Sequence, residues 1–93
     1  MTDHVRVHVI VTGRVQGVAF RADARWAAGR VGVTGWVRNR PGGSVEAVVE
    51  GARAAVEQML AWFRQGSALA RVDAVTCEWE PYRGEFGDFR IVR

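Results

Sequence analysis

The chain has 93 residues, of which 48% are hydrophobic and 25% charged, a balance typical of a globular domain that excludes intrinsic disorder. Its length predicts a single domain over residues 1–93, because two domains would each lack a sufficient core. Thirteen basic residues, all of them arginine, face ten acidic ones, and the net charge of +3 is not gathered in any basic run. We therefore expect no nucleic acid as a partner.

No segment of the chain predicts export or membrane insertion. No apolar run approaches the roughly 20 residues that a membrane helix needs, and the first residues lack the pattern of a signal peptide. The one cysteine, Cys77, excludes an internal disulfide and a cysteine-based metal site and favours a reducing compartment. We therefore expect a cytoplasmic protein without a membrane partner, and a monomer, because no spare apolar face is obvious.

The first half of the chain alternates between the periods of a strand and of a helix. Valines at every second position from 5 to 11 predict a strand with one buried face. Residues 13–19 predict a loop punctuated by glycines. Apolar side chains then recur at helical spacing over residues 20–31, and residues 33–39 predict a second strand.

The second half begins with a tight turn at residues 40–43, in which Pro41 restricts one central position and Gly42 accepts a positive φ at the next. Alternation then predicts the returning strand of a hairpin, and an apolar stripe at helical spacing follows it. The expected later elements are a strand over residues 45–50, a helix over residues 52–63 that ends at Gly66, a strand over residues 75–79 and a short strand over residues 89–91.

This order of elements, β-α-β-β-α-β plus a short tail strand, predicts an α+β fold. It is the ferredoxin-like split βαβ sandwich, in which two helices cover one face of the sheet. Many unrelated functions use this fold, so the fold alone does not indicate an activity.

The predicted topology brings three features of the sequence together at one edge of the sheet. The first two strands run in the same direction, so the loop over residues 13–19 leaves the first strand where Asn39 ends the second. Arg21 lies in the first helical turn at the same edge. Backbone N–H groups of such a loop and an arginine suit a phosphate, but an ordinary strand-to-helix turn with a solvated arginine explains the pattern equally well.

Residues 13–21, GRVQGVAFR, resemble the signature of the acylphosphatases. Residues 35–39, GWVRN, and residues 43–47, GSVEA, resemble a second motif of that family, and residues 89–91 resemble its closing strand. The resemblance covers nearly the whole chain. One departure is Gly42, where many members carry Asp or Asn, and we expect it to affect the turn and not the chemistry.

The resemblance implies a hydrolase that cleaves the carboxyl–phosphate anhydride of small acyl phosphates to a carboxylate and phosphate. It implies no metal, no cofactor and no covalent intermediate. Arg21 matches the arginine that binds the phosphate group, and Asn39 matches the asparagine that orients the attacking water. The matching backbone cradle for the oxygens of a phosphate or sulfate anion consists of Arg14, Val15, Gln16, Gly17, Val18 and Ala19.

Two alternative functions stay open. The first is a non-catalytic binding module for RNA or protein, because ferredoxin-like sheets bind RNA through aromatic side chains on an open face. The outward positions of the first strand lack that aromatic pattern: they are Arg6, His8, Ile10 and Thr12. The second is an accessory domain like those within larger carbamoyl-transfer proteins, which the short chain disfavours.

Several side chains have more than one reading. We expect the Arg14 side chain to face water rather than substrate. For Gln16, the sequence supports equally well a side chain that orients the loop and one without a specific role. His4 and His8 share one strand face, but two ligands are too few for a closed zinc site. Cys77 falls on the buried phase of its strand. Trp36 and Trp79 fit either the core or the open face of the sheet.

Overall fold

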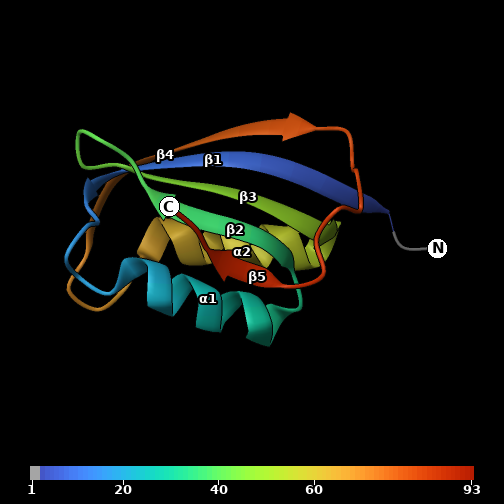
Figure 1. Ribbon diagram of the computed structural model, residues 1–93, viewed down its shortest axis with the longest axis horizontal. Coiled ribbons are helices and arrows are strands. Elements are labelled where there is room, and N and C mark those ends of the chain that lie inside the picture. Colours follow the sequence, from blue (N-terminus) through green and yellow to red (C-terminus); the bar gives the residue numbers. More distant parts are fainter. Residues whose placement is uncertain (1–2) are drawn as a thin grey trace.

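The computed structural model describes residues 3–93 and contains a mixed sheet with two helices packed on one face (Figure 1). The predicted ferredoxin-like α+β fold is confirmed, including the short tail strand. Within the described residues, no helix has the length and apolarity to cross a membrane. The elements are β1 (His4–Arg14), α1 (Phe20–Val31), β2 (Thr34–Asn39), β3 (Val45–Ala52), α2 (Arg53–Gln65), β4 (Arg71–Glu80) and β5 (Phe89–Ile91).

The strands follow the order β4-β1-β3-β2-β5 across the sheet. β1 and β2 each pair antiparallel with β3 between them, so they run in the same direction. Their C-terminal ends, at Arg14 and Asn39, therefore lie at the same edge of the sheet, as the crossover predicts (Figure 1). The tail strand β5 pairs in parallel with β2 and forms one side of the sheet.

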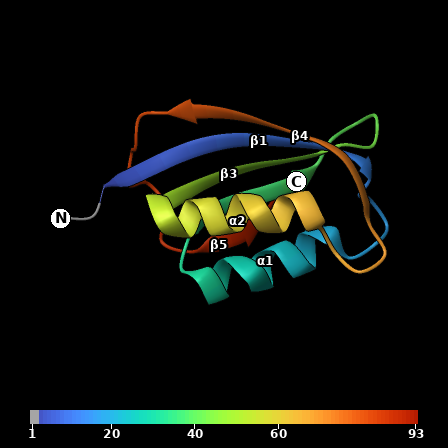
Figure 2. The same cartoon turned by 180° about the vertical axis from the view of Figure 1, so that it is seen from behind.

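One hydrophobic cluster fills the space between the sheet and the helices. The valines of β1 that alternate in the sequence are fully buried there at Val7, Val9 and Val11. Phe20, the first residue of α1, stacks on Phe63 of α2 with the ring centroids 6.1 Å apart. Both helices therefore lie on the same face of the sheet (Figure 2), and the start of α1 is fixed by core packing.

β1 is longer than the sequence predicted, and the loop after it is shorter. The loop was expected to begin at Gly13, but β1 continues to Arg14 because it pairs with β4 as far as Arg71. Gly13 has a φ of 125°, and a Cβ there would lie 2.1 Å from the carbonyl oxygen of Arg71. This glycine therefore serves a close approach between two strands rather than a loop.

β4 lies at the side of the sheet, so the helices cover its inward side chains only partly. Cys77 packs against the core, as its alternation predicts, but it stays half-buried. Trp79 is 46% exposed, and the Arg53 guanidinium carbon lies 5.0 Å from its ring centroid. Trp36 lies on the other face of the sheet, half-buried, with Arg38 over its ring.

The sheet face opposite the helices carries a buried ion-pair cluster that sequence analysis did not identify. Glu50 on β3 is 1% exposed, and Arg6 on β1 pairs with its carboxylate at 3.3 Å. The backbone N–H groups of Arg83, Gly84 and Glu85 donate hydrogen bonds to the same carboxylate. Glu50 thereby holds the segment between β4 and β5 against the open face of the sheet.

Burial alone would raise the pKa of Glu50. Hydrogen bonds from the Arg83 N–H and the Arg6 guanidinium outweigh burial and hold the pKa below its usual range. Because the folded-state pKa is the lower one, the unfolded chain binds the proton more tightly, and ionised Glu50 stabilises the fold at neutral pH. This stabilisation is complete above the pKa of the unfolded state and is lost as the pH falls through the folded-state pKa.

We expect the Glu50→Gln variant to lose part of the acid dependence of stability that the wild-type protein shows. The measurement is the free energy of unfolding in urea at a series of pH values below about 6, where glutamates begin to titrate. Glu57→Gln is the matched control, because Glu57 is exposed on α2. The same pH slope in the wild type and in Glu50→Gln would contradict this role for the cluster.

Candidate functional site

A pocket of about 200 Å³ opens at the edge of the sheet where β1 and β2 end. Arg21 and Asn39, which are distant in sequence, both line it. Its walls come from the loop after β1, from the first turn of α1 and from the ends of β2 and β5. The lining residues are Val15, Gly17, Ala19, Phe20, Arg21, Ala22, Asn39 and Ile91.

The backbone of the loop over residues 15–19 turns sharply at two positions. Gly17 has a φ of 74°, a conformation that favours glycine. Ala19, the N-cap of α1, has a φ of 60°, and among the described residues it alone combines a side chain with a positive φ. Backbone strain of this kind costs about 1 kcal/mol or more, and it concentrates at functional sites. The left-handed turns shape the loop as a concave backbone surface in front of α1.

The side chains of the loop anchor it to the rest of the fold. Val15 and Val18 are buried in the core cluster, so their backbone atoms are what they can offer a ligand. The Ser67 hydroxyl donates a 2.7 Å hydrogen bond to the Val18 carbonyl from below the loop. Of the six residues predicted for the cradle, Val15, Gly17 and Ala19 line the pocket, whereas Arg14, the last residue of β1, Gln16 and Val18 do not.

Gln16 links the loop to the turn between β2 and β3. Its side-chain amide donates to the carbonyl oxygens of Arg40, at 2.8 Å, and Ser44, at 2.9 Å. Arg40 directly follows Asn39, so this clamp ties the loop to the backbone that carries Asn39. Of the two readings that the sequence left for Gln16, the structure therefore supports an orienting contact.

The turn beyond Asn39 has the geometry that its sequence predicts. The Gly43 N–H donates to the Arg40 carbonyl at 3.3 Å, and Gly42 has a φ of 94°. Asn and Asp tolerate a positive φ better than most residues, so glycine meets the same requirement here. The turn closes without strain, and the end of β2 is held in place.

Arg21 is the one charged side chain that lines the pocket, and it is half-buried there. Neither its guanidinium nor the Asn39 amide has a hydrogen-bond or ion-pair partner within residues 3–93. A cation in the first turn of a helix is placed against the helix dipole. An unpaired guanidinium, a positive helix end and a backbone cradle together favour an anion with several oxygens.

Sequence reasoning missed three residues that complete the pocket. Ile91 lines it because β5 pairs in parallel with β2, which brings the tail of the chain beside Asn39. The tail strand itself was predicted, but nothing in its three residues indicates its neighbour in the sheet. Phe20 and Ala22 flank Arg21 on α1 and follow directly from the predicted helix.

The described part of the chain contains no cluster of three or more metal-ligating side chains. His8, weighed as a metal ligand from the sequence, instead pairs with Glu46 on the open face of the sheet. The ring of His4 packs edge-on against that of Tyr82, 5.2 Å away.

The open face of the sheet is unlike a nucleic-acid platform. Carboxylates from two strands lie on it, those of Glu46 and Glu50 on β3 and of Glu78 and Glu80 on β4. Arg6 pairs with Glu50 and Glu80, and Arg38 pairs with Glu46, so these arginines are engaged by carboxylates rather than free for a phosphate backbone. The aromatic Trp36 on this face is half-buried rather than freely presented.

Comparison with known proteins connects the fold and the pocket to one family. The sequence model of the Acylphosphatase family matches residues 7–91. An acylphosphatase of Roseiflexus sp. is 53% identical over 92 residues, which are 99% of each chain. An acylphosphatase structure from Coxiella burnetii has a TM-score of 0.91 at 36% identity and covers 97% of this chain and 94% of its own. The acylphosphatase structure from Bacillus subtilis has a TM-score of 0.92 at 31% identity, with coverages of 96% and 99%.

Proposed function

The chain belongs to the acylphosphatase family, and we propose that the pocket lined by Arg21 and Asn39 is its active site. The protein is an acylphosphatase, a hydrolase of acid anhydrides that cleaves the carboxyl–phosphate bond of small acyl phosphates to a carboxylate and phosphate. Family membership favours this activity over the RNA- or protein-binding module.

In the proposed site, Arg21 binds the phosphate group of the substrate. Its planar fork of N–H donors matches the oxygens of a phosphate, and no protein carboxylate competes for it within the described chain. Backbone N–H groups of the loop from Val15 to Ala19 contribute further donors to these oxygens. The same cradle would hold a free phosphate or sulfate anion.

Asn39 orients the attacking water. Its amide offers both a donor and an acceptor at the end of β2, beside the phosphate group that Arg21 holds. A water fixed in this way attacks phosphorus in line with the bond to the acyl oxygen. The P–O bond to the acyl group breaks, its electron pair stays on the leaving carboxylate, and the proton of the water passes to solvent or to phosphate.

This chemistry needs no general acid and no metal ion. The leaving carboxylate has a conjugate acid with a pKa of about 4 to 5, so it departs without protonation at neutral pH. The remaining work is positioning and stabilisation of the oxygens around phosphorus, which N–H donors perform. The proposed mechanism therefore runs by direct attack of water, without a cofactor or a covalent enzyme intermediate.

One observation carries the proposal. Two side chains from separate sequence motifs, an arginine and an asparagine, line one small pocket and have no other partner in the described structure. The positively charged Arg21 stays half-buried at a helix start without a carboxylate, an arrangement that an anionic ligand would stabilise.

We expect hydrolysis of benzoyl phosphate by the purified protein to persist unchanged in excess EDTA. The assay follows the loss of the acyl phosphate with and without the chelator, and after dialysis against it. Because only protein donors contact the phosphate in the proposed site, removal of metal has no step to block. Activity that EDTA abolishes and a divalent cation restores would contradict the proposed mechanism.

Three further properties belong to the same proposal. We take residues 1–93 as one domain, which the single hydrophobic cluster supports. We place the enzyme in the cytoplasm on the basis of its single cysteine. We take it as a monomer, because the proposed site is assembled from one chain.

A further inference from the structure

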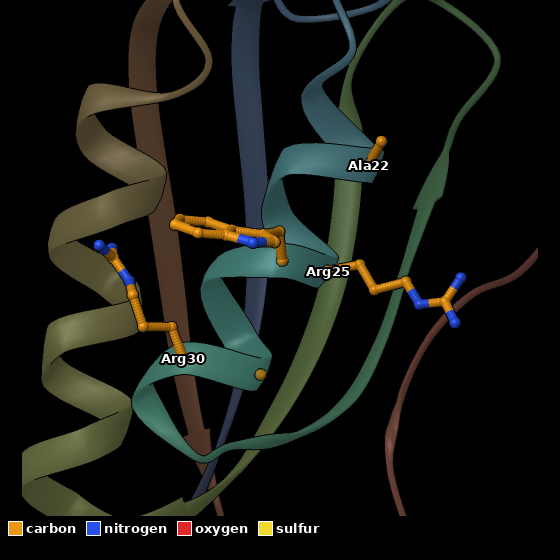
Figure 3. Close-up of a pocket in the computed structure, with 5 residues that line it drawn as sticks. Ala22, Arg25 and Arg30 are labelled. Carbon is orange, nitrogen blue, oxygen red and sulfur yellow. The ribbon is translucent and has the colours of Figure 1, made fainter.

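The outer surface of α1 carries a second hollow, of about 550 Å³, next to the proposed active site (Figure 3). We call this surface the α1 shelf. Ala22 lines both the shelf and the smaller pocket that holds Arg21 and Asn39, so the two hollows meet at this residue. The shelf is lined by Ala22, Arg25, Trp26, Gly29 and Arg30.

Trp26 gives the shelf an exposed aromatic surface. The side chain is 67% exposed and contributes nothing to the core, which is uncommon for so large an apolar group. The Arg30 guanidinium carbon lies 4.8 Å from its ring centroid. The small residues Ala22 and Gly29 leave the helix surface beside the ring uncovered.

Two arginines give the shelf a positive charge. Figure 3 shows Arg25 and Arg30 leaving opposite sides of α1, so that they flank the shelf. Neither forms an ion pair with a carboxylate within residues 3–93. Arg25 also lines the hollow between α1 and β5 on the far side of the helix.

The geometry of the proposed reaction directs the acyl group toward this shelf. In an in-line displacement, the attacking water and the leaving carboxylate lie on opposite sides of phosphorus. Asn39, which orients the water in the proposed mechanism, lies on the strand side of the pocket together with Ile91. Ala22 lies on α1 and lines both hollows, so an acyl group that leaves on the helix side of the pocket reaches the shelf over Ala22.

We propose that the α1 shelf binds the acyl group of the substrate and that the enzyme prefers acyl phosphates with an aromatic acyl group. This inference rests on the proposed active site. A flat acyl ring packs on the exposed face of Trp26, and the positive charge of Arg25 and Arg30 favours a ring that also carries a carboxylate. An acetyl group has no ring to pack on Trp26, so it gains nothing from this contact.

The test compares benzoyl phosphate with acetyl phosphate in the wild type, in Trp26→Ala and in Trp79→Ala. Trp79 is the matched control, because it is also exposed beneath an arginine but lies on β4, outside the pocket. We expect the ratio of kcat/KM for benzoyl over acetyl phosphate to fall about five-fold in Trp26→Ala, the value of one aromatic contact. The fall should appear in KM, since the ring contact is the same in the ground and transition states.

The ratio does not depend on how much of each variant is folded, because both substrates are measured on the same preparation. An unchanged ratio in Trp26→Ala, or an equal fall in Trp79→Ala, overturns the shelf and leaves the active site standing. If the wild-type protein hydrolyses neither substrate, the proposed active site fails and the shelf fails with it. A fall in Trp26→Ala alone supports the shelf.

Discussion

Replacement of Arg21 by alanine is expected to lower the rate of acyl phosphate hydrolysis at least about 100-fold, since loss of one such donor costs about 2.7 to 4 kcal/mol of transition-state stabilisation. Arg21 is the one charged side chain in the pocket, so its loss leaves only backbone N–H groups for the phosphate oxygens. The measurement is kcat/KM for benzoyl phosphate together with the inhibition constant of inorganic phosphate. We expect kcat/KM to fall and the inhibition constant of phosphate to rise, because this arginine contacts the phosphate group both in the bound substrate and in the transition state.

Two variants make this prediction specific. Arg64→Ala removes an arginine from the last turn of α2, outside the pocket, and should keep full activity. Arg21→Lys keeps the charge but loses the planar fork, so we expect only a partial recovery of the rate. A folded Arg21→Ala enzyme with near wild-type activity would overturn the assignment of the site.

The Asn39→Ala variant is also expected to lose at least about 100-fold in rate, on the same energetic scale, but through a different kinetic constant. Asn39 acts on the water and not on the bound phosphate, so the loss should fall on kcat. The inhibition constant of inorganic phosphate should stay close to that of the wild type. The comparison of kcat with this constant distinguishes Asn39 from Arg21.

The Gln16 clamp supplies the control for Asn39. Gln16→Ala removes the two hydrogen bonds that tie the loop to Arg40 and Ser44, and it leaves the Asn39 amide in place. We expect a smaller loss of kcat than in Asn39→Ala, because the water is still bound but less well positioned. A loss of phosphate binding in Asn39→Ala, with kcat retained, would contradict the role in orienting water.

Local periodicity was sufficient to predict the helices and most of the strands. The stripe of α2, for example, ends at Gly66 as predicted, because a helical run of buried side chains and a terminal glycine are local features. β1 and β4 were both predicted too short, β4 by its first four residues, because pairing with a distant strand extends each of them beyond its local alternation. The last residues of β1 are held by pairing with β4, near Arg71, and no local pattern at Gly13 reveals that distant strand.

Motif spacing and the crossover rule were sufficient to predict that Arg21 and Asn39 converge. The contacts that support them were not predictable. Gln16 binds the backbone carbonyl groups of Arg40 and Ser44. Every residue has a backbone carbonyl, so the sequence does not indicate which of them a given side chain will bind. The hollow beside Trp26 was not predictable either. The helical period indicates that position 26 is exposed, but it does not show that a hollow forms beside the exposed ring.

The sequence by itself therefore determined the order and type of the elements, the parallel direction of β1 and β2 and the two residues that meet at their ends. These follow from side-chain period, which depends on near neighbours, and from the rule that two strands joined by a helical crossover run in the same direction. The tertiary structure alone decided the partner of β5, the burial of Glu50 beneath the segment from Arg83 to Glu85, and the contact between the loop and the β2–β3 turn. Each of these joins residues far apart in the chain, and such pairings are selected by the packing of the whole molecule rather than by any local preference.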